Sequence, residues 1–197
     1  MTTASSIKNF TLLAALTLGA WTSAQAMNVV NTIGLTGSSS TGYSAGLSDP
    51  TGTEVNHAVS GAFTDTFTFS FTGGSTIDVW LNTVAESSRL ATQQIVFTSA
   101  TINGQALSID PIQTSGSGKN MTQYGSAGLF EVPANGNLVL VINGYAGLMG
   151  SEGSPISASY SGGINVMPSA VPEPESYALL LAGLGAIGFI ARRRAVR

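Results

Sequence analysis

The sequence predicts an all-β fold for the middle of the chain, an antiparallel β-sandwich of jelly-roll or immunoglobulin-like kind. Three observations predict it. The 197 residues include 24 glycines and no cysteine, and only 9% are charged, a poor composition for helices rich in Ala, Leu, Glu and Lys. Apolar residues alternate with Thr and Ser at a period of two, which is typical of strands. Turn-forming dipeptides separate several such runs.

The N-terminal end has the pattern of a secretory signal peptide. Lys8 gives a positively charged start, and an apolar stretch follows at 10–20. The triplet Ala24-Gln25-Ala26 then fits the small-x-small pattern at which signal peptides are cleaved. We therefore expect residues 1–26 to be removed and the exported chain to begin at Met27. A buried N-terminal helix is the alternative, and the abrupt change to strand-like sequence disfavours it.

The clearest predicted strand runs from Phe63 to Phe71. Its four phenylalanines fall on one face, and its hydroxyl residues at 64, 66, 68 and 70 fall on the other. This is the pattern of an antiparallel strand with one buried and one solvated face. Gly73-Gly74 predicts a turn, and the apolar positions of 77–81 continue with period two. We expect the two strands to pair as a hairpin.

Turn signals divide the rest of the domain, residues 27–168, into further short strands. Asn103-Gly104 is a strong type I′ hairpin signal, and 85–94 has the spacing of one or two helical turns. The segment 138–142 is apolar on both faces, which predicts a central strand covered on both sides. The last strand is expected to break at Gly162-Gly163. The further strands are expected at 29–35, 95–102, 105–109, 129–132, 138–142 and 156–166.

Asp65 shares its strand face with the phenylalanines, so we expect its side chain to point toward the core. A buried carboxylate must be paired or hydrogen-bonded. Possible donors are Arg89, the indole N–H of Trp80, a tyrosine hydroxyl and loop backbone N–H groups. We interpret Phe63, Asp65 and Phe67 as a structural motif that ties a loop to the sheet; a calcium ligand or a catalytic acid is the alternative.

Trp80 falls on the strand face opposite to Ile77 and Leu81, together with Asp78 and Asn82. A tryptophan beside an acid and an amide on an open sheet face suits stacking on sugar rings. Trp80 is therefore a possible glycan contact. The alternative is that it packs in a second layer of the sandwich.

The charged and metal-binding residues exclude several classes of function. Residues 27–168 carry two cations and eight anions, a net charge of −6, whereas a nucleic-acid site needs a basic patch. The absence of cysteine excludes disulfides and thiolate chemistry. The single histidine, His57, is expected in a loop, and it supports neither a zinc site nor a Ser-His-Asp triad. Asp49 and Glu54 flank a turn, for which weak calcium binding is a less favoured alternative. We expect no metal, no cofactor and no catalytic residues.

The C-terminal segment, residues 169–197, has three parts in a fixed order. Pro172, Glu173 and Pro174 keep the approach extended. An uncharged apolar run follows at 177–191, where we expect a transmembrane helix. Its length would be about 22 Å at 1.5 Å per residue, short of a hydrocarbon core of about 30 Å. The cluster at 192–197 contains Arg192, Arg193 and Arg194, which should stay cytoplasmic.

This segment resembles the PEP-CTERM sorting signal of Gram-negative bacteria. The resemblance implies that an exosortase, a membrane-embedded cysteine protease, recognises the tail, and that the source makes extracellular polysaccharide and biofilm. The stretch Phe63-x-Asp65-x-Phe67 resembles the FxDxF-type subgroup of these proteins.

We therefore expect an exported, non-enzymatic surface or extracellular-matrix protein. It would be anchored transiently in the inner membrane, cut near Pro172–Pro174 by an exosortase, and then associated with exopolysaccharide or biofilm. A carbohydrate-binding module on the same sandwich is the alternative, and a hydrolase has the least support.

Overall fold

The computed structural model describes residues 25–52, 54–169 and 174–195. Nearly all of the predicted signal peptide, residues 1–26, lies outside this range, as do Pro172 and Glu173. The described elements, in chain order, are β1 (Val30–Ile33), β2 (Thr36–Ser38), β3 (Gly42–Gly46), β4 (Val55–Val59), β5 (Gly61–Phe69), β6 (Gly74–Glu86), η1 (Ser87–Arg89), α1 (Leu90–Gln93), β7 (Ile95–Ile102), β8 (Gln105–Ala106), β9 (Ser108–Ile109), β10 (Gln113–Ser115), η2 (Gly118–Asn120), β11 (Thr122–Asn135), β12 (Leu138–Ala146), β13 (Pro155–Pro168) and α2 (Pro174–Ala195).

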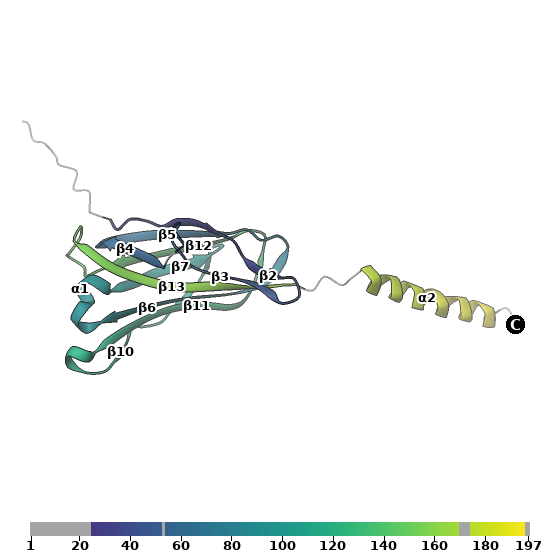
Figure 1. Ribbon diagram of the computed structural model, residues 1–197. Coiled ribbons are helices and arrows are strands. Elements are labelled where there is room, and N and C mark those ends of the chain that lie inside the picture. The colour runs from purple at the N-terminus through teal and green to yellow at the C-terminus, as the bar shows by residue number, and fades with distance from the viewer. Residues whose placement is uncertain (1–24, 53, 170–173, 196–197) are drawn as a thin grey trace, which may run out of the picture.

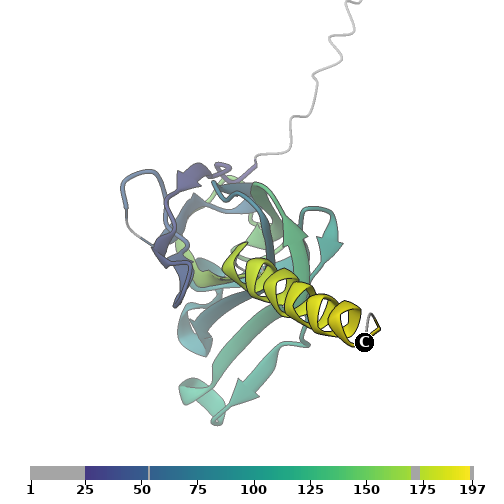
Figure 2. The ribbon, with the colours of Figure 1, turned by 90° about the vertical axis from the view of Figure 1, so that its right-hand side faces the viewer.

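Two sheets form a β-sandwich (Figures 1 and 2). Sheet A has the strand order β1-β5-β12-β7-β8. Sheet B has the order β10-β11-β6-β13-β3-β2, and in addition β4 pairs with β13 and β9 pairs with β11. The pairing is antiparallel except between β1 and β5, which run parallel. The structure is thus consistent with the predicted β-sandwich.

The core fills the space between the two sheets. Its residues come from alternate positions of each strand, because successive side chains of a strand point to opposite faces. On β5 the pattern is the predicted one: the phenylalanines are buried, and Thr64 faces solvent. The largest core side chains with no exposed surface include Phe67, Phe69, Leu81, Ile102, Leu138, Leu140, Ile142 and Ile164.

The expected hairpin between the Phe63–Phe71 and 77–81 strands is wrong. β5 pairs with β1 and β12 in sheet A, whereas β6 pairs with β11 and β13 in sheet B. The chain reverses near Gly73, which has a φ of 101°, and crosses from one sheet to the other. Each strand therefore presents its apolar face to the opposite sheet, which satisfies the same alternating pattern as a hairpin would.

Three other strand predictions have mixed outcomes. The Asn103-Gly104 hairpin is confirmed, because both residues have positive φ (47° and 81°) and β7 pairs with β8. The 138–142 strand is central in sheet A, as predicted, but it is covered on one face only, since Val139 is 36% exposed. The expected break at Gly162-Gly163 is wrong, because β13 pairs with β6 without interruption through both glycines.

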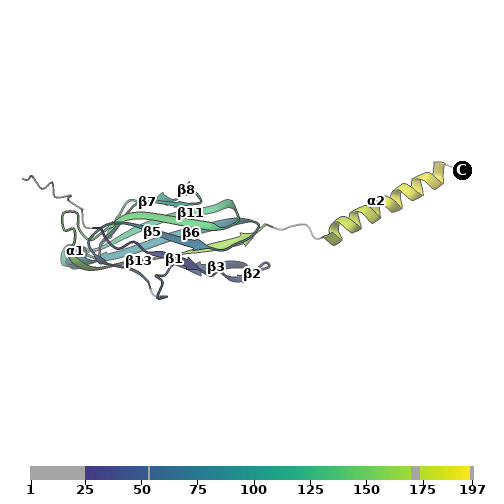
Figure 3. The ribbon, with the colours of Figure 1, turned by 90° about the horizontal axis from the view of Figure 1, so that it is seen from above.

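The C-terminal segment forms the 22-residue helix α2 (Figures 1 and 3). Its apolar side chains are exposed; Leu179 and Phe189, for example, are 74% and 69% exposed. The expected transmembrane helix at 177–191 is not supported. Within the part of the chain that the structure describes, no helix has the length and apolar character that a membrane span requires.

Candidate functional site

A buried polar cluster surrounds Asp65, which has no exposed surface. The backbone N–H of Val29 donates to its Oδ1 at 2.7 Å, and the hydroxyl of Tyr160 donates to its Oδ2 at 2.6 Å. His57 Nε2 lies 3.1 Å from the same Oδ2. We refer to Asp65, His57 and Tyr160 as the Asp65 cluster. Each carboxylate oxygen therefore has at least one donor, as burial requires.

The sequence anticipated two of these partners and missed the third. A tyrosine hydroxyl and a backbone N–H were among the four kinds of donor considered for Asp65. His57 was expected in a loop, but it lies in β4 and is 1% exposed. Its ring stacks on Phe63 with the ring centres 4.1 Å apart. The alternation of Val55, His57 and Val59 was the available signal, because it places His57 on the apolar face of a short strand.

The Asp65 cluster links the two sheets. Asp65 belongs to β5 in sheet A, whereas His57 and Tyr160 belong to β4 and β13 in sheet B. Val29 adds the segment that precedes β1. Burial, and then the charge of Asp65, raise the pKa of the Tyr160 hydroxyl above its ordinary value of 10.0, so the hydroxyl keeps the proton that it donates.

The geometry of the Asp65 cluster does not match a hydrolytic triad. In such a triad, one histidine nitrogen faces the acid and the other faces the nucleophile. The Nδ1 atom of His57 is buried and has no hydrogen-bond partner within the described range. Ser60, the buried serine that follows β4, instead donates to the carbonyl of Ala146 and lies 3.0 Å from the hydroxyl of Ser151.

The residues considered for calcium binding form a turn. The Oδ1 atom of Asp49 accepts hydrogen bonds from the backbone N–H and the hydroxyl of Thr51. Among the residues with described positions, no three His, Cys, Asp or Glu side chains group in a way that could hold a metal.

Trp80 lies on the outer face of sheet B, between the buried residues Val79 and Leu81. It is half-buried, because its indole ring covers Gly163 of β13. A Cβ atom at Gly163 would lie 2.5 Å from Cζ2 of Trp80. The sheet neighbours of Trp80 are Gly128 on β11 and Gly163 on β13. The indole is thus not enclosed within the sandwich, and Trp80 stays a candidate for binding.

A hollow lies further along the same two strands, β6 and β13, where Asn82 and Ser161 are the next outward-facing residues after Trp80 and Gly163. It begins where the pairing of β6 with β13 ends, at Thr83 and Tyr160. The hollow has a volume of about 220 Å³ and is lined by Glu54, Asn82, Thr83, Val84, Ser159, Tyr160 and Ser161. Most of these residues offer hydroxyl, amide or carboxylate groups, so the hollow is suited to a polar ligand.

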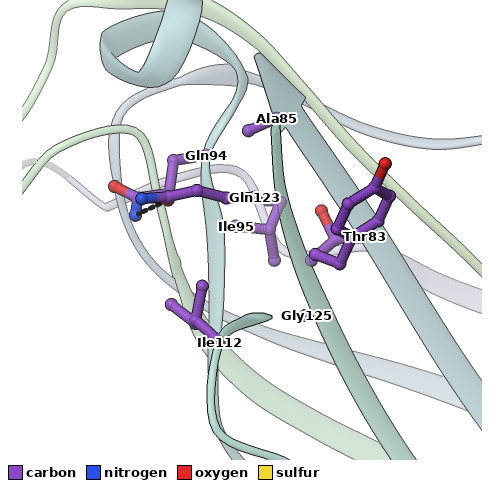
Figure 4. A pocket seen from close by; sticks show the side chains of 8 residues that line it. Thr83, Ala85, Gln94, Ile95, Ile112, Gln123 and Gly125 are labelled. Atoms are coloured by element: carbon purple, nitrogen blue, oxygen red, sulfur yellow. Dashed lines mark hydrogen bonds between the residues drawn. The ribbon is translucent and has the colours of Figure 1, made fainter. Parts of the chain in front are cut away.

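A second cavity, near α1, is too small to hold a ligand. Its volume is about 10 Å³, room for about one water molecule. Gln94 donates to Gln123 at 3.2 Å beside it (Figure 4).

Of the predicted sorting residues, the structure describes little. Pro174 is the first residue of α2, where proline's fixed φ is compatible with a helix start. Arg192 is exposed. Pro172 and Glu173 lie outside the described residues, as do the side chains of Arg193 and Arg194.

Comparison with known proteins concerns mainly the tail. Residues 170–194 match the PEP-CTERM protein-sorting motif. The match does not include β5, so the FxDxF resemblance stays a prediction. No curated protein matches the chain. Among solved structures, PliG of Aeromonas hydrophila, a periplasmic inhibitor of g-type lysozyme, matches with 12% identity and a TM-score of 0.29 over 72% of this chain and 100% of its own. A TM-score this low supports no argument.

Proposed function

We propose that the protein is a non-enzymatic surface or extracellular-matrix protein, exported as a precursor and sorted by an exosortase. The observation that carries the proposal is the sorting motif at 170–194, which directly follows the last strand of the sandwich. The motif implies export and recognition of the C-terminal tail. The proposal adds that the sandwich acts at the cell surface or outside the cell, in contact with the polysaccharide matrix.

The tail would act in two steps. The exposed apolar side chains of α2 would associate transiently with the inner membrane, where the exosortase is embedded. Cleavage near Pro172–Pro174 would then separate the sandwich from α2. Since the described contacts of the core involve only residues 26–166, the sandwich would keep its packing after the tail is removed.

The test is the intact mass of the protein recovered outside the cell. A mass that ends near 172–174 would support the proposal, and a mass that retains 177–197 would overturn it. A chain carrying Pro172→Ala, Glu173→Ala and Pro174→Ala should stay unprocessed with the cells. The Ser176→Ala variant is the matched control, because it changes a residue close to the Pro172-Glu173-Pro174 triplet but leaves the triplet intact, and it should be processed normally.

The second candidate function is carbohydrate binding by the sandwich. It is favoured by the half-buried Trp80 and the adjoining polar hollow, both on the outer face of sheet B. It is compatible with the first candidate, because a sorted surface protein can hold the matrix through such a face.

A further inference from the structure

The neighbourhood of Trp80 contains a second aromatic ring seated in the same way. Phe130 on β11 is 62% exposed, and its ring covers Gly128. A Cβ atom at Gly128 would lie 2.7 Å from Cε2 of Phe130. Gly128, Trp80 and Gly163 are direct neighbours across β11, β6 and β13. Two rings therefore lie over one row of three strands, which spans about 10 Å at roughly 4.8 Å per strand.

A bulge in β11 positions the Phe130 ring. The register with β6 shifts between Leu129 and Val132, and Glu131 within the bulge has a φ of 56°. This left-handed conformation is costly for a residue other than glycine. The carboxylate of Asp78 accepts the backbone N–H of Glu131 at 2.8 Å and so stabilises the bulge. Bulges commonly re-aim a side chain in this way.

We propose that Trp80 and Phe130 form a platform that binds a neutral polysaccharide, with its hydroxyl groups directed into the adjoining hollow. This inference rests on the carbohydrate-binding candidate above and names its site and ligand class. Aromatic faces stack on the apolar C–H faces of sugar rings. Beside them, Glu54, Asn82, Ser159 and Ser161 supply hydrogen-bonding groups in the hollow.

The charges decide between neutral and anionic polysaccharides. Asp78, Glu54 and Glu131 lie at or beside the platform and the hollow, whereas the two cations of residues 27–168 are in η1 and η2. Arg89 also lies 3.7 Å from Glu86. Among the described residues, none of these three carboxylates forms an ion pair with a cation, so they would repel a polyuronate of like charge. A neutral polymer offers hydroxyl donors to the same carboxylates.

The chain provides its own spectroscopic probe. It has two tryptophans, Trp21 and Trp80, and Trp21 lies in the predicted signal peptide. Once that segment is removed, tryptophan emission reports on Trp80 alone. Titration with soluble laminarin, a neutral β-glucan, should shift or quench this emission, whereas titration with alginate, a polyuronate, should not.

The experiment uses the exported protein and measures retention on laminarin, cellulose and alginate. Phe130→Ala and Trp80→Ala should each weaken binding to the neutral polymers about threefold to tenfold, the range of a single aromatic contact. Trp80→Tyr, which keeps an aromatic ring at this position, should retain most of the binding to the neutral polymers. Gly163→Ala, which displaces the indole without removing it, should also weaken binding. The control is Val30→Ala, an exposed apolar residue (69%) of β1 in sheet A.

The outcomes separate the claims. Retention on none of the polymers would overturn both the carbohydrate-binding candidate and this site. Retention on neutral polymers that Phe130→Ala and Trp80→Ala leave unchanged would overturn the site and keep the candidate. Stronger retention on alginate would overturn the ligand class. If Phe130→Ala instead changes the mass of the particle in solution, the platform is a contact between copies and the proposal is wrong. Circular dichroism of each variant shows whether it folds.

Discussion

Tyr160 is the residue through which we would test the Asp65 cluster. Its hydroxyl donates to Asp65 Oδ2 at 2.6 Å inside the core, and Tyr160→Phe removes only that donor. We expect the free energy of unfolding to fall by about 1–3 kcal/mol, because a buried carboxylate oxygen loses a partner. Urea unfolding followed by circular dichroism measures the change.

Tyr145→Phe is the matched control for that measurement. The Tyr145 hydroxyl donates to Glu152 at 2.8 Å, but Glu152 is exposed, so water can replace the lost bond. We expect a loss of less than about 1 kcal/mol. Equal losses in the two variants would show that the Asp65 cluster adds no more than a surface hydrogen bond.

Tyr160 should also make the stability of the protein depend on pH in the alkaline range. The pKa of Tyr160 is raised in the folded protein from 10.0, so above about pH 10 only the unfolded chain loses this proton. The contribution of Tyr160 to stability is therefore complete below pH 10 and declines as the pH rises. Above about pH 10, the free energy of unfolding of the wild type should fall by roughly 1.4 kcal/mol per pH unit relative to that of Tyr160→Phe. Urea unfolding between pH 9 and 11 measures it, and a constant difference between the two proteins would contradict the assignment.

Among the strands, the β11 bulge carries a backbone strain that can be relieved. Glu131 has a φ of 56°, which glycine adopts at no steric cost. We expect Glu131→Gly to raise the free energy of unfolding by about 1 kcal/mol, as measured by thermal and urea unfolding. Glu131→Ala is the control, since alanine removes the carboxylate but keeps the Cβ. If alanine stabilises as much as glycine, the gain comes from charge and not from the backbone.

The strands most accessible to sequence analysis were those with a strong period of two. β5, β7 and β12 were predicted close to their observed positions, because their apolar residues face a single core. β3 and β4 were missed, since Gly42–Gly46 and Val55–Val59 contain Gly, Ser, Asn and His. The pairing of β5 with β6 was predicted wrongly, because a glycine turn indicates that the chain reverses and not which sheet it enters.

The candidate site was predictable only in part for a related reason. The alternation on β6 placed Trp80 on the outer face, and the phenylalanines around Asp65 placed that carboxylate inside. The partners across the sheet were not predictable. Gly128, Phe130 and Gly163 lie 48 or more residues after Trp80 in the sequence, and only the observed strand register brings them beside it. His57 reaches Asp65 in the same way, through the packing of one sheet on the other.

The domain as a whole holds together without disulfides, because the chain has no cysteine. The apolar core between the two sheets holds them together, and the hydrogen bonds of the Asp65 cluster add a polar link between them. The segment before β1 is also hydrogen-bonded to the sandwich. The backbone N–H of Val29 donates to Asp65, and the carbonyl of Val29 accepts the backbone N–H of Thr66 at 2.8 Å. The first residues after the predicted cleavage site are therefore part of the fold.

The packing of Ala26 gives a prediction about where the mature chain should begin. Ala26 is 2% exposed, belongs to the core, and donates its backbone N–H to Ala62 at 3.0 Å. Cleavage after Ala26 would remove that hydrogen bond and that methyl group. We expect a mature chain that starts at Met27 to be less stable than one that starts at Gln25 by about 1–2 kcal/mol, from roughly 1 kcal/mol for the hydrogen bond and roughly 0.8 for the methyl.

Two exported chains that differ only in this start would be compared by urea unfolding, and the intact mass of the natural protein would show which start the cell produces. A natural start at Gln25 would mean that processing preserves the Ala26 contacts. A natural start at Met27 with the expected loss would mean that the protein folds without its most stable N-terminus. Equal free energies of unfolding for the two chains would contradict the contribution assigned to Ala26. In that case the charged N-terminus at Met27 would be accommodated beside Ala62 as well as the buried alanine is.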